Sequence, residues 1–204
     1  SAGDMDVVLI DTPGHIDFTA EAERSLNVLD AAILIISSES VNKRTRQIWS
    51  KLDKYAIPRI IFVNKCDLAS FDKEKISTQF HSLSSAIFDA FKLQNIDEEL
   101  NEKIAFSSDY ALDIFEQKAC FDQQDLKMLV NKAALFPCVY GSALRGDGVK
   151  ELISLLSYFD VKREYDDAFS CFVYKITRDK TGSRLSHVKI TGGSVSLKQS
   201  INDE

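Results

Sequence analysis

The sequence predicts an α/β protein built on a doubly wound, mostly parallel sheet, followed by the beginning of an antiparallel β domain. Three observations lead to this prediction. Short, continuous apolar runs recur along residues 7–140, and such runs are typical of strands that are buried on both faces. Segments with helical spacing alternate with them, which favours a parallel sheet. From Asp166 onward the apolar residues follow a period of two, which is typical of hairpins.

Four apolar runs are expected to form the parallel strands. They are Val7–Ile10, Ala32–Ile36, Ile60–Val63 and Cys138–Tyr140. In an open α/β sheet, ligands bind beyond the carboxyl ends of the strands. Polar and unusual residues follow three of these runs directly, so we expect these residues to face one crevice.

The helices are expected between the strands. Arg44–Tyr55 and Val149–Phe159 carry apolar residues at helical spacing. Residues 68–136 interrupt the alternation, and we interpret them as a mostly helical insertion within a partial domain of residues 1–165. Two helices are expected in the insertion, one marked by Phe80, Leu83, Ile87 and Phe91 and the other by Leu126, Leu129, Val130 and Ala133.

The last part of the chain, residues 166–204, is expected to begin a second domain. A first strand runs through Phe172–Ile176, Asp179–Gly182 gives a turn signal, and Leu185–Ile190 returns as a second strand. Val195–Leu197 suggests a third strand. Three strands are only marginally stable by themselves.

The composition argues against several classes of protein. Hydrophobic residues make up 45% and charged residues 27%, as in an ordinary globular protein. No segment approaches the roughly 20 apolar residues of a membrane span, and no secretion signal is indicated, so we expect a cytoplasmic protein without a membrane partner. The net charge of -6 argues against broad, non-specific nucleic-acid binding by this segment. The four cysteines form no C-x-x-C pair and are interpreted as reduced thiols.

Asn64-Lys65-Cys66-Asp67 matches the pattern N-K-x-D at the end of a predicted strand. An ionised aspartate accepts two hydrogen bonds, and guanine offers its N1–H and its N2 amine side by side. Adenine lacks this pair of donors and would leave the carboxylate unpaired, at a cost of about 1–3 kcal/mol. Asn64 can tie the loop to its neighbours, and the stem of Lys65 can lie over the base. A solvated loop is the alternative for this pattern alone.

Asp11-Thr12-Pro13-Gly14-His15 places D-x-x-G directly after another predicted strand. Asp11 can hold the hydration shell of Mg²⁺, an ion that keeps several waters when proteins bind it. Gly14 lets the backbone N–H approach a γ-phosphate closely. His15 follows at once, where it can orient the attacking water. A structural or surface histidine is the alternative.

Gly141-Ser142-Ala143-Leu144 follows the last of the predicted parallel strands and matches a third pattern, S-A. The backbone N–H groups of such a loop can meet the O6 atom of guanine. The pattern carries little information on its own. Its position after D-x-x-G and N-K-x-D, in that order and at three strand ends, indicates a guanine-nucleotide site.

At these motifs the chain resembles translational GTPases of the elongation factor G branch. Residues 11–18 look like their D-T-P-G-H-x-D-F segment, and residues 25–32 are similar to their helix-to-strand passage. Leu135-Phe136-Pro137 with Gly141-Ser142-Ala143 resembles most closely the tetracycline ribosomal protection proteins, which dislodge tetracycline from the ribosome. The resemblance implies a P-loop-NTPase-like fold, a long insertion after N-K-x-D and a β barrel as the second domain.

The resemblance also implies an activity. The parent protein would bind GTP or GDP with Mg²⁺, hydrolyse GTP and act on the RNA and protein of the ribosome. Asp11 would serve the metal through water, Gly14 the γ-phosphate and His15 the attacking water. The base pocket would be formed by Asn64, Lys65, Asp67, Ser142, Ala143 and Leu144.

Two departures from the family pattern matter. Nothing in the 204 residues matches G-x-x-x-x-G-K-[ST], the phosphate loop that precedes D-x-x-G in the family. We therefore expect a truncated G domain that is inactive alone. Leu144 stands where many GTPases have lysine. Two other classes stay open as alternatives, namely a GTPase switch outside translation that binds a protein effector and a non-catalytic binding module. The sequence does not separate tetracycline resistance from ordinary translocation.

Overall fold

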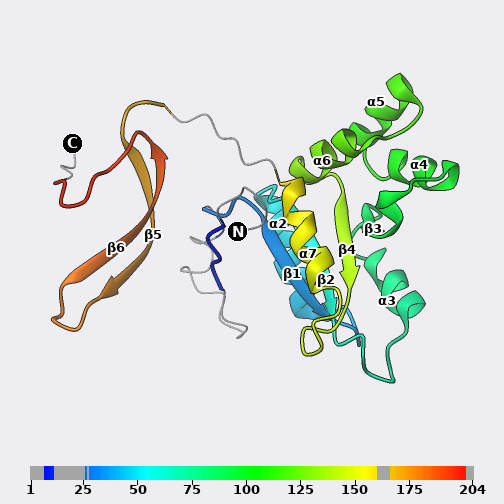
Figure 1. Ribbon diagram of the computed structural model, residues 1–204, viewed down its shortest axis with the longest axis horizontal. Coiled ribbons are helices and arrows are strands. Elements are labelled where there is room, and N and C mark those ends of the chain that lie inside the picture. Colours follow the sequence, from blue (N-terminus) through cyan, green and yellow to red (C-terminus); the bar gives the residue numbers. More distant parts are fainter. Residues whose placement is uncertain (1–6, 12–25, 27, 160–165, 201–204) are drawn as a thin grey trace. The chain divides into compact units, whose positions relative to one another are not determined.

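The computed structural model describes residues 7–11, 26, 28–159 and 166–200 (Figure 1). They belong to two compact units, one formed by residues 1–9 and 30–160 and the other by residues 10–29 and 161–204. The first unit holds a four-stranded parallel sheet with helices, and the second holds a two-stranded antiparallel sheet. The predicted fold class is confirmed.

The first unit alternates strands and helices along most of its length. In chain order its elements are β1 (Ala32–Ser37), α2 (Lys43–Lys54), β2 (Arg59–Asn64), α3 (Lys73–Phe80), β3 (Ile87–Asp89), the 3-10 helix η1 (Lys92–Gln94), α4 (Glu98–Ala105), α5 (Asp109–Lys118), α6 (Gln123–Asn131), β4 (Phe136–Tyr140), α7 (Val149–Leu155) and the 3-10 helix η2 (Leu156–Tyr158). The strand order is β1-β2-β4-β3, and every neighbouring pair is parallel. The runs predicted at 32–36, 60–63 and 138–140 are therefore strands.

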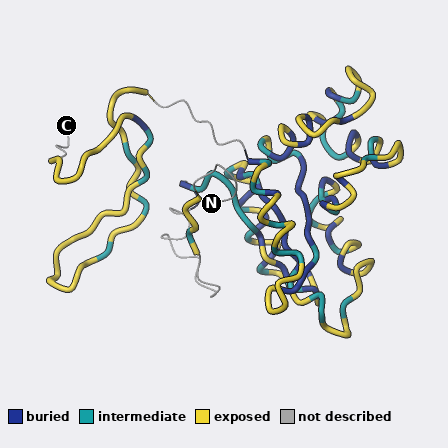
Figure 2. The backbone as a smooth tube through the Cα atoms, viewed as in Figure 1, coloured by how far each residue is buried: buried dark blue, intermediate teal, exposed yellow. Residues whose placement is uncertain are grey.

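The central strand β2 separates two hydrophobic cores, because successive side chains of a strand point to opposite faces. Ile60 and Phe62 pack with residues of α4, α5, α6 and α7, whereas Ile61 and Val63 pack with residues of α2 and α3. Helices thus cover both faces of the sheet, and Figure 2 shows its central strands β2 and β4 mostly as buried. This explains why β2 and β4 read as unbroken apolar runs.

Arg59 begins β2 and is fully buried, with an exposed fraction of 0%. Its guanidinium carbon lies 3.8 Å from the ring centroid of Trp49 and 4.2 Å from that of Phe136. It forms an ion pair with Asp53, while Nε and Nη1 have no hydrogen-bond partner in the described part of the chain. Burial lowers the pKa of Arg59. The planar group is therefore held mainly by two aromatic rings.

Much of the acidic character of the predicted insertion serves helix capping. The side chains of Asp72, Asp97 and Asp122 accept hydrogen bonds from backbone N–H groups in the first turns of α3, α4 and α6. Asp125 completes a capping box with Asp122, and Ser108 caps α5. Caps satisfy N–H groups that have no partner inside the helix, typically at about 1 kcal/mol each. These carboxylates thus have a structural role.

The insertion helix predicted through Phe80, Leu83, Ile87 and Phe91 is wrong beyond Phe80, its first marker residue. Phe80 ends α3, whereas Ile87 belongs to β3 and pairs in parallel with Phe136 of β4. Serines interrupt the helix between them. The N–H of Ser84 still bonds to the carbonyl of Phe80 at 2.9 Å, but the Ser84 hydroxyl then accepts the Ala86 N–H at 3.0 Å. Such local side-chain bonds compete with the backbone bonds of a helix. The residues of β3 form backbone hydrogen bonds with β4 instead.

Two predicted strands are also wrong. Val7–Ile10 forms no strand, and Val8 and Leu9 are 89% and 80% exposed. An apolar run becomes a strand only where a neighbouring strand supplies hydrogen bonds, and this run has no such partner among the described residues. Val195–Leu197 lies in a turn in which Ser196 and Gln199 bond to each other, and Leu197 is 99% exposed. Nothing in the described residues covers its side chain.

The predicted hairpin of the second unit is confirmed. Strands β5 (Ser170–Arg178) and β6 (Arg184–Gly192) pair antiparallel, with an irregularity between Val173 and Lys175. The turn is closed by the Asp179 carboxylate, which accepts the N–H groups of Thr181 at 2.8 Å and Ser183 at 2.9 Å. Most hairpin residues are exposed (Figure 2). A lone two-stranded sheet buries little apolar surface.

Candidate functional site

Three strands of the parallel sheet end in polar loops at the same edge. Ser37 pairs with Asn64 where β1 and β2 end, and Val63 pairs with Tyr140 where β2 and β4 end. Since these strands are parallel and neighbours, their carboxyl ends meet (Figure 1). The segments that follow them are residues 38–42, 65–72 and 141–148. This edge is where open α/β sheets bind ligands.

Asn64 joins the second and third of these loops. Its Oδ1 atom accepts the N–H of Lys65 at 2.8 Å and the N–H of Ala143 at 2.9 Å. A backbone bond from Cys66 N–H to the Gly141 carbonyl, at 3.0 Å, adds a second connection. The N-K-x-D loop and the S-A loop are therefore one hydrogen-bonded assembly.

Lys65 holds an uncommon backbone conformation, with φ at 68°. Non-glycine residues rarely adopt positive φ, and the strain is of order 1 kcal/mol or more. Two bonds to its carbonyl offset this strain, from the Ser38 hydroxyl at 2.9 Å and from the Leu68 N–H at 3.2 Å. The conformation leaves the Lys65 side chain exposed at the mouth of the loop. Ser38 was not predicted as a site residue; its only sequence signal is its position directly after a strand.

The S-A loop depends on glycine at Gly141. A Cβ atom there would lie 2.1 Å from the carbonyl oxygen of Asp147, closer than real contacts allow. The absence of a side chain lets the Ser142 N–H reach that same oxygen at 3.0 Å and close the loop. Ala143 and Leu144 stand out from the closed loop, and Leu144 is 91% exposed.

Two backbone N–H groups of this loop, those of Ala143 and Leu144, differ in whether they are hydrogen-bonded within the protein. The N–H of Ala143 is used by Asn64, so it is not a free donor in this conformation. The N–H of Leu144 takes part in no hydrogen bond among the described residues. Of the two, Leu144 offers the open backbone donor.

Asp67 presents a carboxylate beside the same loop, and its side chain is 15% exposed. The Ser142 hydroxyl is buried, and its Oγ has no hydrogen bond of regular geometry among the described residues. Its proximity is the main cause that lowers the pKa of Asp67; the Asp67 backbone N–H and the Arg145 guanidinium lower it further, against the opposing effect of desolvation. The carboxylate is therefore ionised near neutral pH and acts as an acceptor only.

The structure brings six of the nine predicted site residues together. They are Asn64, Lys65, Asp67, Ser142, Ala143 and Leu144. Asp11 is exposed and belongs to the other unit, so its place relative to these loops stays a prediction. Gly14 and His15 lie outside the described residues.

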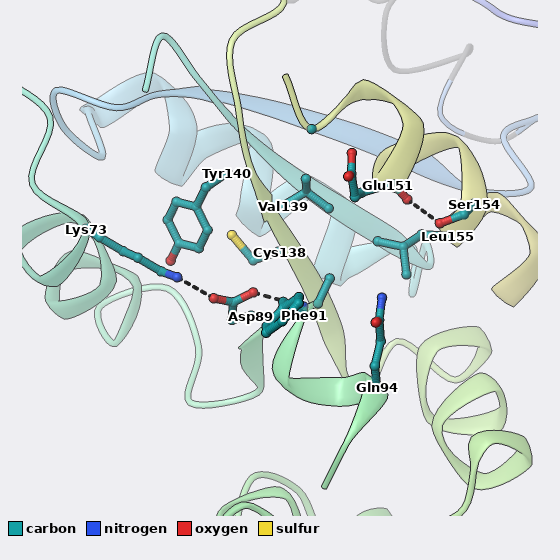
Figure 3. Close-up of a pocket in the computed structure, with 12 residues that line it drawn as sticks. Lys73, Asp89, Phe91, Gln94, Cys138, Val139, Tyr140, Glu151, Ser154 and Leu155 are labelled. Carbon is teal, nitrogen blue, oxygen red and sulfur yellow. Dashed lines mark hydrogen bonds and ion pairs between the residues drawn. The ribbon is translucent and has the colours of Figure 1, made fainter. Parts of the chain in front are cut away.

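A separate cavity of about 280 Å³ lies at the ends of β3 and β4, against α7 (Figure 3). It contains none of the predicted site residues. Two of its charged groups are engaged with each other, since Lys73 Nζ lies 2.5 Å from Asp89 Oδ2 and Asp89 Oδ1 accepts the Phe91 N–H at 3.0 Å. Glu151 also lines the cavity. Burial raises the pKa of the Cys138 thiol in its wall. The raised pKa disfavours the thiolate, which is the nucleophilic form of a cysteine.

The described residues contain no group of three or more histidine, cysteine or acidic side chains that could hold a metal ion. The predicted Mg²⁺ ligand Asp11 would act through water and would not need such a group. None of the helices in the described ranges is long and apolar enough to cross a membrane.

The fold and these loops agree with the comparison to known families. Residues 2–160 match the family described as the Elongation factor Tu GTP binding domain. The chain belongs to this family of GTP-binding domains, which confirms the resemblance to translational GTPases.

Several of the proteins similar to this chain are tetracycline resistance proteins. Tetracycline resistance protein TetP of Clostridium perfringens is 32% identical to this chain over 222 residues, covering 96% of the chain and 34% of TetP. TetW of Butyrivibrio fibrisolvens is 34% identical and TetS of Listeria monocytogenes 30% identical, each over 96% of the chain and 33% of the relative. The chain thus spans about a third of the length of these curated relatives.

Proposed function

We propose that this chain forms most of the GTP-binding domain, and the start of a second, β-barrel domain, of a ribosomal protection protein that confers tetracycline resistance. In this proposal residues 1–165 are the partial G domain, 68–136 its insertion and 166–204 the beginning of domain II. The hydrogen bond between Asn64 and Ala143 carries the proposal, because it joins the loop of the Asp67 carboxylate to the loop of the open Leu144 N–H, the two groups that base recognition would use. The similarity to tetracycline resistance proteins supports the biological role.

Base recognition follows from the chemistry of the two loops. The ionised Asp67 accepts hydrogen bonds from guanine N1–H and the N2 amine, and the open N–H of Leu144 donates to O6. The exposed stem of Lys65 covers one face of the base. Adenine would present an acceptor at N1 and a donor at C6, so Asp67 and Leu144 would both lose their partners. Each unpaired buried group costs about 1–3 kcal/mol, enough for a strong preference for guanine.

Phosphate chemistry is assigned to the other predicted residues. Asp11 holds the hydration shell of Mg²⁺, the backbone N–H of Gly14 contacts the γ-phosphate and His15 orients the attacking water. The bound ion would neutralise the phosphate charge that grows during hydrolysis. The apolar Leu144 packs on the base edge where many GTPases place lysine.

The whole protein acts, in this proposal, on the RNA and protein of the ribosome in the cytoplasm. GTP hydrolysis releases a loop that senses the γ-phosphate, and the released state leaves the ribosome. An elongation factor G-like translocation activity is the close variant of this proposal.

The decisive experiment uses the full-length protein. Ribosome-stimulated GTP hydrolysis, co-sedimentation with ribosomes in the presence of a non-hydrolysable GTP analogue, and growth of a tetracycline-sensitive host are measured together. All three are expected, and rescue of growth separates protection from translocation. GTPase activity that ribosomes do not stimulate would favour a switch outside translation. An absence of nucleotide binding would leave only a binding module and overturn the proposal.

A further inference from the structure

Asp67 has one cationic neighbour among the described residues. The Nε atom of Arg145 lies 3.5 Å from Asp67 Oδ2, and the side chains are 62% and 15% exposed. Arg145 follows directly after Leu144, the position where many GTPases have lysine. A positive charge is therefore present at this loop, displaced by one residue along the chain.

The backbone of the S-A loop sets this displacement. The N–H of Arg145 bonds to the Ser142 carbonyl at 3.2 Å, which closes a tight turn over residues 142–145. Within this turn the Arg145 side chain reaches Asp67, while Leu144 stands in solvent. The ion pair joins the S-A loop to the N-K-x-D loop at a point beyond the Asn64–Ala143 hydrogen bond.

A contribution to folding does not explain the pair. Ion pairs with an exposed partner contribute little to stability, because solvent screens them and long side chains lose freedom on pairing. The guanidinium also contacts the carboxylate by Nε at 3.5 Å and not by a bidentate fork, which is the strong geometry. The effect of Arg145 is instead local, on the direction of one carboxylate.

We propose that Arg145 is a positioning residue for guanine recognition, an inference that rests on the proposed function. Through the contact of its Nε with Oδ2, it fixes the direction in which the Asp67 carboxylate points. Each carboxylate oxygen can accept about two hydrogen bonds. Oδ2 can therefore keep Arg145 while both oxygens accept the two guanine donors, so the arginine assists the base and does not compete with it.

The test measures displacement of a fluorescent GDP analogue from the full-length protein. Arg145→Ala is expected to weaken GDP binding by about 3–10-fold, the effect of one exposed charge on a hydrogen-bonded carboxylate. Arg145→Lys restores part of the affinity because it returns the charge without the planar group. Lys150→Ala is the matched control, since Lys150 is an exposed cation in the first turn of α7 and forms no ion pair among the described residues. It should leave GDP binding unchanged.

A double-mutant comparison separates positioning from general loop damage. In an Asp67→Asn background, measured with xanthosine diphosphate, Arg145→Ala should change affinity less than twofold, because no carboxylate is left to orient. An equal loss in both backgrounds overturns the inference. Unchanged or tighter GDP binding by Arg145→Ala overturns the inference as well. In that case, normal GDP binding by the wild-type protein would leave the proposed function intact. If the wild-type protein does not bind GDP, the proposed function itself is wrong.

Discussion

The Oδ1 atom of Asn64 lies 2.9 Å from the backbone nitrogen of Ala143, although 79 residues separate them in the chain. The bond crosses the entire predicted insertion. It makes the N-K-x-D loop and the S-A loop depend on each other, so a substitution in one loop is expected to alter the conformation of the other. The predictions below use this dependence and the groups arranged around it.

Asp67→Asn should change the base preference of the full-length protein. The new amide presents its NH₂ group to the N2 amine of guanine, donor against donor. Xanthine carries a carbonyl at that position, so it gains a bond while N1–H still meets the amide oxygen. With about 1–3 kcal/mol per mismatched contact, the preference should swing more than tenfold toward xanthosine triphosphate. Displacement assays with both nucleotides measure the swing.

Asp113→Asn serves as the control for this swap, because Asp113 is an exposed carboxylate on α5. It should keep the wild-type preference. If Asp67→Asn also keeps its preference for GTP, then Asp67 does not read the base, and the assignment of residues 64–67 is wrong.

Residues 1–204 alone should bind GTP weakly and hydrolyse none. Most nucleotide affinity in such proteins comes from contacts to the phosphates and Mg²⁺, and this chain has no G-x-x-x-x-G-K-[ST] segment to make them. Calorimetry at high protein concentration checks the affinity. A submicromolar dissociation constant would show that the base loops or an unrecognised phosphate site suffice.

His15→Ala should slow ribosome-stimulated GTP hydrolysis of the full-length protein by about 10²–10⁴, the usual contribution of a group that orients the reacting water. GTP binding should stay nearly unchanged, because the imidazole is assigned to the water and not to the nucleotide. Single-turnover hydrolysis and equilibrium binding are compared on the same preparations. Wild-type turnover in the variant would assign His15 a structural role only.

Gly141→Ala should disrupt the S-A loop, since its Cβ would lie 2.1 Å from the Asp147 carbonyl oxygen. The loop must open, which breaks the Ser142–Asp147 bond and moves the donor of Leu144. We expect a loss of about 1–3 kcal/mol in urea denaturation and weaker GDP binding by the full-length protein.

Gly146→Ala is the control for this substitution. Gly146 has positive φ, at 80°, which Gly141 does not, and nothing lies within 4 Å of the added atom. Only backbone strain remains, at about 1 kcal/mol, and nucleotide binding should persist. Equal effects of the two substitutions would rule out close packing as the reason for glycine at position 141.

Arg59→Ala should lower the free energy of unfolding by about 2–4 kcal/mol, as expected when a large, fully buried side chain is truncated. The cavity would lie between the rings of Trp49 and Phe136. Arg59→Met fills much of the volume without the charge, so it should recover part of the loss. Urea denaturation followed by Trp49 fluorescence measures both. If Arg59→Met is as unstable as Arg59→Ala, the charge and not the packing stabilises this site.

The sequence predicted those features that local pattern determines. Strands β2 and β4 are buried on both faces, so their apolar runs are continuous and easily recognised. Strand β1 reads as an apolar run as well, although Ile35 is 64% exposed and only Leu34 and Ile36 are buried. The motifs at Asn64 and Ser142 follow such strands directly, and strand order then brings them together. The GTP-binding family was recognised from the same residues.

Features that depend on distant partners were not predictable. Strand β3 has three residues, and the spacing of Ile87 from Phe80 matches a helix equally well; only the ladder with β4 decides between them. The run Val7–Ile10 is apolar enough for a strand, but hydrogen-bond partners decide whether one forms. The contact of Ser38 with Lys65 spans 27 residues and belongs to no motif.

The pairing of β3 with β4 makes the residues between the N-K-x-D loop and the S-A loop part of the sheet itself. Strand β4 ends in the loop that carries Ser142, and it is flanked on one side by β2 and on the other by β3. The helices that follow β3 close the core beneath it. A lineage that shortened this segment would have to replace a sheet edge and several core helices at once. Deleting this segment would therefore remove the strand that pairs with β4 and much of the apolar packing around it.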